Sequence, residues 1–148
     1  MEDNKTTAEI MADITSELLD FCLNNQEKIA INLGLTVSEF KTLRLLKKDQ
    51  MISVGDLAKK MNLSNSRLTR IIDGLFLKSI IRRDIGTHDR RVMEIMLTKE
   101  GLKITQNLNE QYIKSQQYIV DHFEPGSEKD VLAALMNLSN AIKLSAEK

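Results

Sequence analysis

The stretch RRDIGTHDRRVMEIMLT, residues 82–98, contains two segments that favour β-strands, separated by a turn. Residues 80–83 and 91–97 are rich in β-branched and apolar side chains, and a turn is predicted at residues 85–88. A two-stranded ribbon is too thin to bury a guanidinium group, so the arginines of this stretch are expected to be solvated, paired or bound to a ligand. They are Arg82, Arg83, Arg90 and Arg91.

The positive charge of the chain is concentrated around this hairpin. The 148 residues carry no net charge, because 21 Lys or Arg balance 21 Asp or Glu. Residues 59–103, however, hold eleven basic and five acidic residues, whereas the remainder holds ten basic and sixteen acidic. Six of the seven arginines lie between Arg67 and Arg91. This separation of charge is typical of a protein with one face that meets a polyanion, although a charged run can also serve only to solvate a surface.

Two short helices joined by a tight turn are predicted immediately before the hairpin. Ser53 and Ser64 are good N-cap residues, and each precedes apolar side chains at the spacing i, i+3, i+4, i+7 that marks one helix face. Only two residues separate the first helix from Ser64. The pair is a helix-turn-helix candidate, although many proteins contain this shape without binding nucleic acid. The inward residues of the second helix are Leu68, Ile71, Ile72 and Leu75.

The opposite face of this second helix carries small polar and basic side chains. Short side chains allow a helix to approach a major groove, its N-terminal amides meet phosphate, and Arg or Asn can hydrogen-bond to base edges. An ordinary solvated face is the alternative explanation. The outward residues are Asn65, Ser66, Arg67, Thr69, Arg70 and Asp73, and the predicted DNA contacts are Ser64, Asn65, Ser66, Arg67, Thr69 and Arg70.

The hairpin is predicted to supply further DNA contacts. An arginine at the tip of a ribbon can enter a minor groove, where the negative potential is strongest at narrow A·T tracts, and Arg91 is assigned this role. Asp89 is expected to hold Arg91 in one rotamer through an ion pair, which lowers the entropic cost of insertion. Arg82 and Arg83 are expected mainly to supply positive potential and phosphate contacts. The predicted contacts of the hairpin are Arg82, Arg83, Thr87, His88, Asp89, Arg90 and Arg91.

Longer helices are predicted on both sides of this region. The first has about 28 residues and a length of roughly 40 Å, which is too long to be buried against one small domain. The apolar stripes of the first and the last two helices therefore predict a stable homodimer. The expected boundaries are a capping box at residues 6–9 and an end near Gly34 for the first helix, a capping box at residues 36–39 for the second, Thr98 and about Phe123 for the fifth, and Ser127 for the start of the sixth.

Several residues are compatible with other functions. Cys22 could act as a redox sensor, but a lone cysteine between Phe21 and Leu23 is more often a small core residue. His88, His122 and Cys22 lack the spacing of a metal site, so no metal is predicted. Because no nucleophile–base pair, phosphate loop or carboxylate pair stands out, neither an enzyme nor a cofactor is predicted. The polar start and the lack of a membrane-length apolar run favour a cytoplasmic location.

The sequence also resembles a known family. Asp89-Arg90-Arg91, followed by Leu97-Thr98-Lys99-Glu100-Gly101, resembles the wing signature of the MarR family of winged-helix transcription regulators, and residues 64–75 resemble its recognition helix. Two departures are Ser79, where the family often has glycine, and Ile85, where it often has proline. Both concern local wing geometry.

The resemblance implies a mainly α fold, a winged helix-turn-helix of order α-α-α-α-β-β-α-α within a single domain, residues 1–148. Residues 36–97 are the expected DNA-binding part, and residues 1–35 and 98–148 form the expected dimerisation helices. The implied function is a repressor that binds palindromic double-stranded DNA as a homodimer and is released by a small anionic or aromatic ligand. The alternative is a dimeric winged-helix module for protein–protein interaction that does not bind DNA.

Overall fold

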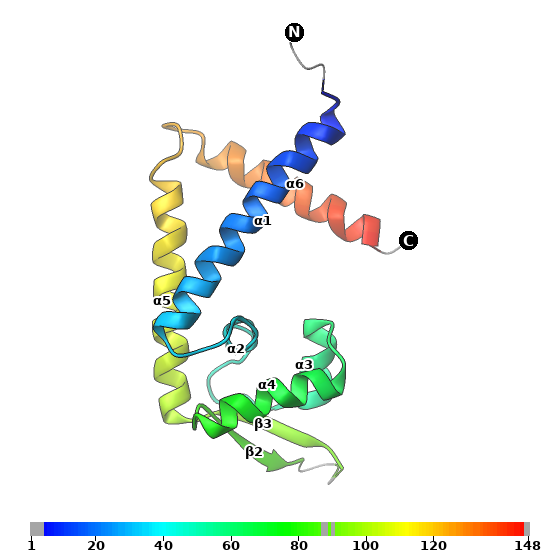
Figure 1. Ribbon diagram of the computed structural model, residues 1–148, viewed down its shortest axis with the longest axis vertical. Coiled ribbons are helices and arrows are strands. Elements are labelled where there is room, and N and C mark those ends of the chain that lie inside the picture. The colour runs from blue at the N-terminus through cyan, green and yellow to red at the C-terminus, as the bar shows by residue number, and fades with distance from the viewer. Residues whose placement is uncertain (1–4, 87–88, 90, 147–148) are drawn as a thin grey trace. The chain divides into compact units, whose positions relative to one another are not determined.

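The computed structural model describes residues 5–86, 89 and 91–146 (Figure 1). The chain packs as two compact units, one ending at Tyr112 and the other beginning at Ile113. The described elements are mainly helical, as predicted, with one small antiparallel sheet. They are α1 (Thr7–Asn32), α2 (Val37–Leu43), β1 (Ile52–Ser53), α3 (Val54–Met61), α4 (Asn65–Leu77), β2 (Ile81–Ile85), β3 (Met93–Leu97), α5 (Lys99–Val120) and α6 (Glu128–Ala146).

The sheet has a strand that the sequence pattern did not predict. Its order is β1-β3-β2, and β1 joins it by pairing Ile52 with Ile95 and Ser53 with Glu94. The predicted order of six helices with a two-stranded hairpin is confirmed over the described residues, and β1 is an addition to it. A two-residue strand is too short to show any periodicity, and it exists only because the chain entering α3 runs beside β3.

The hairpin itself lies slightly later than predicted. The strands pair Ile81 with Leu97 and Ile85 with Met93, so β2 starts one residue late and extends two residues further than expected. The start is delayed because Ser79 has a left-handed backbone, with φ at 59°, which turns the chain between α4 and β2. In the loop between β2 and β3, the structure describes Gly86, Asp89, Arg91 and Val92.

The helix starts follow the predicted capping residues. Thr6 and Thr36 each form a complete capping box with the glutamate three residues later. The backbone amide and hydroxyl of Thr6 donate hydrogen bonds to Glu9 and lower the pKa of its carboxyl group. Ser53 and Ser64 accept hydrogen bonds from the backbone at Asp56 and Arg67. The Thr98 hydroxyl accepts from the amide of Gly101 at 2.9 Å, which starts α5.

The hydrophobic core lies in the first unit, between the C-terminal end of α1, helices α2 to α4, the sheet and the first half of α5. Of the four residues predicted to face inward from α4, Ile71 is partly buried and the other three are fully buried. Figure 1 shows α4 beside the β2–β3 hairpin, against which it packs. The core residues are Ile29, Ala30, Leu35, Phe40, Leu43, Leu46, Leu57, Ala58, Leu68, Ile72, Leu75, Ile80, Ile81, Ile95 and Leu108.

Large apolar side chains on α1 and α6 are exposed. On α6, none of the described residues is buried within the chain. Cys22 is also exposed, so the expectation that it is a core residue of the single chain was wrong. Over the part of the chain that the structure describes, no helix combines the length and apolarity needed to span a membrane. The exposed apolar residues are Ile10, Met11, Ile14, Leu18, Leu19, Phe21, Leu23 and Ile31 on α1, and Leu132, Leu135, Met136, Ile142 and Leu144 on α6.

Candidate DNA-binding surface

The turn between α3 and α4 fixes the start of the helix that is predicted to contact DNA. Asn62 ends α3 in the left-handed region, with φ at 53°, and the amide of Leu63 donates to the carbonyl of Ala58 at 2.9 Å. Asparagine tolerates this backbone conformation better than most residues. Ser64 follows directly and caps α4. The two helices are therefore held in a tight helix-turn-helix.

The exposed face of α4 carries the side chains expected there. Thr69 is fixed by a hydrogen bond of 2.8 Å from its hydroxyl to the carbonyl of Asn65. Arg67 and Arg70 form no ion pair with any residue that the structure describes, so both cationic groups are available to a ligand. The exposed residues are Ser64, Asn65, Ser66, Arg67, Thr69 and Arg70.

Arg83 joins the hairpin to α4. Its guanidinium group forms an ion pair with the Asp73 carboxylate and lies 4.6 Å from the ring centre of Phe76, also on α4. Only 24% of the Arg83 side chain is exposed. Asp73 keeps half of its side chain exposed, so its expected outward position is not contradicted. One expectation is corrected here: Arg83 links two elements instead of mainly contacting phosphate, because its guanidinium group pairs with Asp73.

Arg82 points to the other side of the sheet, as its neighbouring position in the strand requires. Its Nε lies 3.3 Å from Oδ2 of Asp84, and 58% of its side chain is exposed. A phosphate contact by Arg82 stays a prediction.

The tip of the hairpin is partly outside the described residues, which leaves out Thr87, His88 and Arg90. Gly86 closes the loop by donating its amide to the carbonyl of Val92 at 2.8 Å. A Cβ on Gly86 would lie 2.7 Å from the carbonyl oxygen of Asp89, so the loop is compact at this point.

The Asp89 carboxylate orients the backbone of Arg91. Its Oδ1 accepts a hydrogen bond of 2.9 Å from the Arg91 amide, and the described residues include no ion pair between the two side chains. The predicted ion pair between the Asp89 and Arg91 side chains is therefore wrong, and Asp89 contacts the main chain of Arg91 instead. The Arg91 side chain is exposed. Asp89 can still direct Arg91, but by fixing the backbone from which its side chain extends.

The fold agrees with comparisons to known proteins. The family model described as "MarR family" matches residues 35–93. The uncharacterized HTH-type transcriptional regulator YsmB of Bacillus subtilis (strain 168) is 30% identical over 141 residues, which cover 91% of this chain and 94% of that protein. The chain belongs to the MarR family.

Two further comparisons agree with this result. The HTH-type transcriptional repressor MdtR of Bacillus subtilis (strain 168) is 31% identical over 100 residues, covering 66% of this chain and 64% of that protein. The crystal structure of a mutant MarR from Escherichia coli, complexed with operator DNA, has the same fold. Its TM-score is 0.74 at 20% sequence identity, and the match covers 89% of this chain and 92% of that chain.

Two residues that hold α4 in this MarR-family chain were missed in the sequence. Nζ of Lys78, at the end of α4, lies 2.6 Å from Oε2 of Glu39 and 2.8 Å from the carbonyl oxygen of Gly34. Glu39 was identified only as part of a capping box. The sequence offers no signal for the ion pair, because its partners are 39 residues apart.

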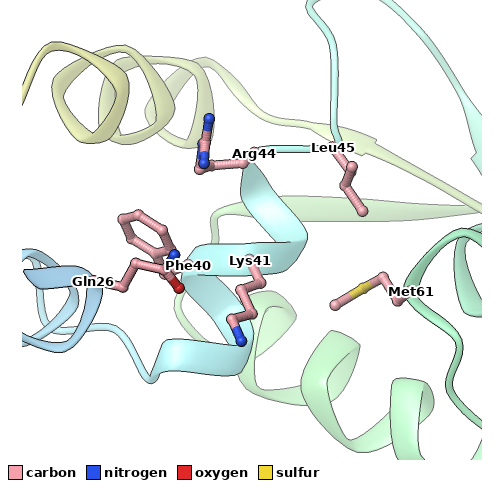
Figure 2. A pocket seen from close by; sticks show the side chains of 6 residues that line it. All are labelled: Gln26, Phe40, Lys41, Arg44, Leu45 and Met61. Atoms are coloured by element: carbon pink, nitrogen blue, oxygen red, sulfur yellow. The ribbon is translucent and has the colours of Figure 1, made fainter. Parts of the chain in front are cut away.

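An open cavity of about 370 Å³ lies beside the helix-turn-helix (Figure 2). It is formed by the end of α1, by α2 with the residues after it, and by Met61 at the end of α3. The Arg44 guanidinium lies 4.0 Å from the ring centre of Tyr112, and Oε1 of Gln26 is buried with no hydrogen-bond partner among the described atoms. The lining residues are Gln26, Phe40, Lys41, Arg44, Leu45 and Met61.

No metal centre is visible in the described part of the chain. The residues that the structure describes contain no group of three or more His, Cys, Asp or Glu side chains placed to hold a metal ion. His122 lies in the turn after α5, where its Nδ1 is 2.7 Å from the carbonyl oxygen of Tyr118. His88 lies outside the described residues.

Proposed function

We propose that the chain is a sequence-specific DNA-binding transcriptional regulator that binds palindromic operators as a homodimer. The observation that carries this proposal is the exposed polar and basic face of α4, which contains two arginines without ion-pair partners among the described residues. The names of its relatives and the fold it shares with the operator-bound MarR support it.

Helix α4 enters the major groove in this proposal. Its first turn combines short side chains with backbone amides at a helix N-terminus, which permits close approach and favours contact with a phosphate. Arg67 and Arg70 follow within reach of base edges, and an arginine can make two hydrogen bonds to a guanine. Arg91 extends from the hairpin toward the neighbouring minor groove, while Arg82 supplies a phosphate contact.

The exposed apolar side chains of α1 and α6 form the dimer interface in this proposal. Burial of a large apolar side chain stabilises an assembly by about 1.5–3 kcal/mol, so leaving this many exposed in a monomer is unfavourable. A two-fold dimer presents two copies of α4, which fits an operator of palindromic sequence.

A small anionic or aromatic effector binds in the cavity beside α2 in this proposal. Lys41 and Arg44 offer positive charge, Phe40 offers an apolar wall, and the unpartnered oxygen of Gln26 can accept a hydrogen bond from the ligand. Met61 places the cavity next to the turn that starts α4, so an occupant can alter DNA affinity. In this proposal the protein represses transcription, and binding of the effector releases it from the operator.

Selection from a random duplex library tests the proposed function. The full-length protein should enrich a palindrome and bind it far more tightly at low salt, because release of counterions makes phosphate contacts salt-dependent. Weak binding that ignores sequence would contradict a regulator and favour an interaction module. Sedimentation at micromolar concentration should give a dimer, and a monomer would contradict the assembly.

Benzoate, as a probe, tests the effector part separately. Millimolar benzoate should weaken operator binding by the wild type and have less effect on Arg44→Ala. An equal effect on both proteins would place the effector elsewhere.

A further inference from the structure

Three parts of the first unit meet at the side chain of Lys78. Its ammonium group contacts the carbonyl oxygen of Gly34, in the turn after α1, and the carboxylate of Glu39, in the first turn of α2. Lys78 itself is the C-cap of α4. We name these three residues, Lys78, Glu39 and Gly34, the Lys78 junction.

The junction is a constrained contact. The Glu39 side chain is only 5% exposed, and its Oε2 also accepts the amide of Thr36 at 2.8 Å. A buried carboxylate without a partner lowers the stability of the fold, so loss of the contact with the ammonium group is unfavourable. Gly74, one turn before Lys78, lies so close that a Cβ would be 2.5 Å from Oε1 of Glu39. Helix α4 is therefore held against α2 at two successive turns.

The location of this contact matters for DNA binding. The junction holds the C-terminal end of α4, whereas the residues predicted to contact bases lie in its first two turns. Helix α4 has 13 residues, which corresponds to a lever of about 20 Å. A rotation of about 10° at the junction would move the other end by roughly 3.4 Å, which is the rise of one base pair.

We propose that the Lys78 junction sets the spacing between operator half-sites that the dimer accepts. This inference rests on the proposed function, since it requires a dimer in which α1 contributes to the interface and two copies of α4 contact one duplex. The junction connects the turn that follows α1 to the end of α4, so it fixes how far each α4 lies from the dimer axis. Lys78 and Glu39 are positioning residues in this scheme, because neither contacts a base.

Two substitutions remove the ion pair with little change in shape. Lys78→Met keeps an unbranched side chain of similar length, and Glu39→Gln keeps an oxygen that can complete the capping box. Lys103→Met is the matched control, because it removes one lysine from an exposed ion pair with Glu100. Lys78→Arg, which retains the charge, is the conservative variant.

The experiment measures affinities for the selected palindrome, for the same site with one base pair inserted or deleted at its centre, and for an isolated half-site. The wild type, Lys103→Met and Lys78→Arg should lose about tenfold or more in affinity when the spacing changes. Lys78→Met and Glu39→Gln should lose less than about threefold, with unchanged base preference in the half-site. A folded Lys78→Met dimer with the wild-type spacing preference would overturn the inference.

A second measurement uses the protein without DNA. Spin labels at Thr69→Cys, with Cys22 replaced by serine, report the distance between the two α4 helices of a dimer. Lys78→Met and Glu39→Gln should broaden this distribution relative to Lys103→Met, and an unchanged distribution would count against the junction. If both variants fail to fold, the ion pair is a requirement for folding and the inference is wrong. A wild type that selects no palindrome contradicts the proposed function instead, while the label distances still report on the junction.

Discussion

Gly101 of α5 lies against the carbonyl group of Ile80, so closely that a Cβ at position 101 would overlap the carbonyl oxygen. Thr98, at the start of α5, also contacts the backbone at Ile80. Its amide donates to the Ile80 carbonyl at 3.0 Å, and its hydroxyl lies 2.7 Å from the carbonyl oxygen of Ser79. The Leu97-Thr98-Lys99-Glu100-Gly101 sequence thus has a structural explanation: threonine caps α5, and glycine lets α5 approach the start of the hairpin.

Gly101→Ala should destabilise the protein. The added methyl group meets backbone that cannot move without shifting β2, so the free energy of unfolding should fall by about 2–3 kcal/mol. Urea unfolding measures the change. Gly55→Ala in α3 is the control, because the nearest atom to its added Cβ is 4.0 Å away and alanine favours a helix. Equal effects of the two substitutions would show that the close approach is unimportant.

Ser79→Gly should stabilise the protein. Ser79 is held at a φ of 59°, where most L-residues are strained and glycine is not. The gain in the free energy of unfolding should be about 0.5–1 kcal/mol, after allowance for the greater flexibility of glycine in the unfolded chain. Thermal unfolding of Ser79→Gly and Ser79→Val checks the sign. A destabilised Ser79→Gly would mean that the serine side chain has a role of its own.

Local signals explain which features were predictable from the sequence. A cap and the apolar face that follows it lie within two helical turns, so the starts of α1 to α4 could be identified from Thr6, Thr36, Ser53 and Ser64. The residues alone predicted the hairpin, and the family resemblance identified it as the wing of a winged helix. Strand β1 was missed because two residues show no pattern.

Pairings between elements were not predictable in the same way. Periodicity indicates that a residue lies on an exposed or buried face, but it does not name the neighbour across the interface. Arg83 was therefore expected mainly to supply positive potential and phosphate contacts, whereas its partner in the structure is Asp73. Lys78 received no role, although it forms an ion pair with Glu39.

Asp73 and Arg83 should be energetically coupled. Asp73→Asn and Arg83→Met each leave a half-buried partner without its ion pair, so each should lower the free energy of unfolding. The double variant should be more stable than the sum of the single effects predicts, by about 0.5–1.5 kcal/mol. A double-mutant cycle in urea measures this coupling, and additive effects would show that the ion pair contributes nothing. Arg82→Met, which disrupts the more exposed pair with Asp84, is the control and should have little effect.

Arg67→Ala should relax base preference at one position of the operator. If the guanidinium makes two hydrogen bonds to a base, its loss costs about 1–3 kcal/mol of discrimination at that base pair. Affinities for the palindrome and for single-base variants, measured at one salt concentration, provide the test. A uniform loss across all sequences would identify Arg67 as a phosphate contact instead.

Arg91 and Asp89 give the sharpest test of the hairpin. Arg91→Ala should weaken operator binding without unfolding the dimer, since the side chain is exposed, and should flatten the salt dependence by about one unit. Asp89→Ala should also weaken binding, although it removes a negative charge from a surface that meets DNA, because the Arg91 amide loses its hydrogen-bond partner.

Asp89→Asn separates these two effects of the carboxylate. The asparagine oxygen can still accept the hydrogen bond from the Arg91 amide, while the negative charge is gone. Asp89→Asn should therefore bind the operator at least as tightly as the wild type, whereas Asp89→Ala binds it less tightly. Titrations at several salt concentrations check the order. Tighter binding by a folded Asp89→Ala would contradict an orienting role, because simple electrostatics would then account for both variants.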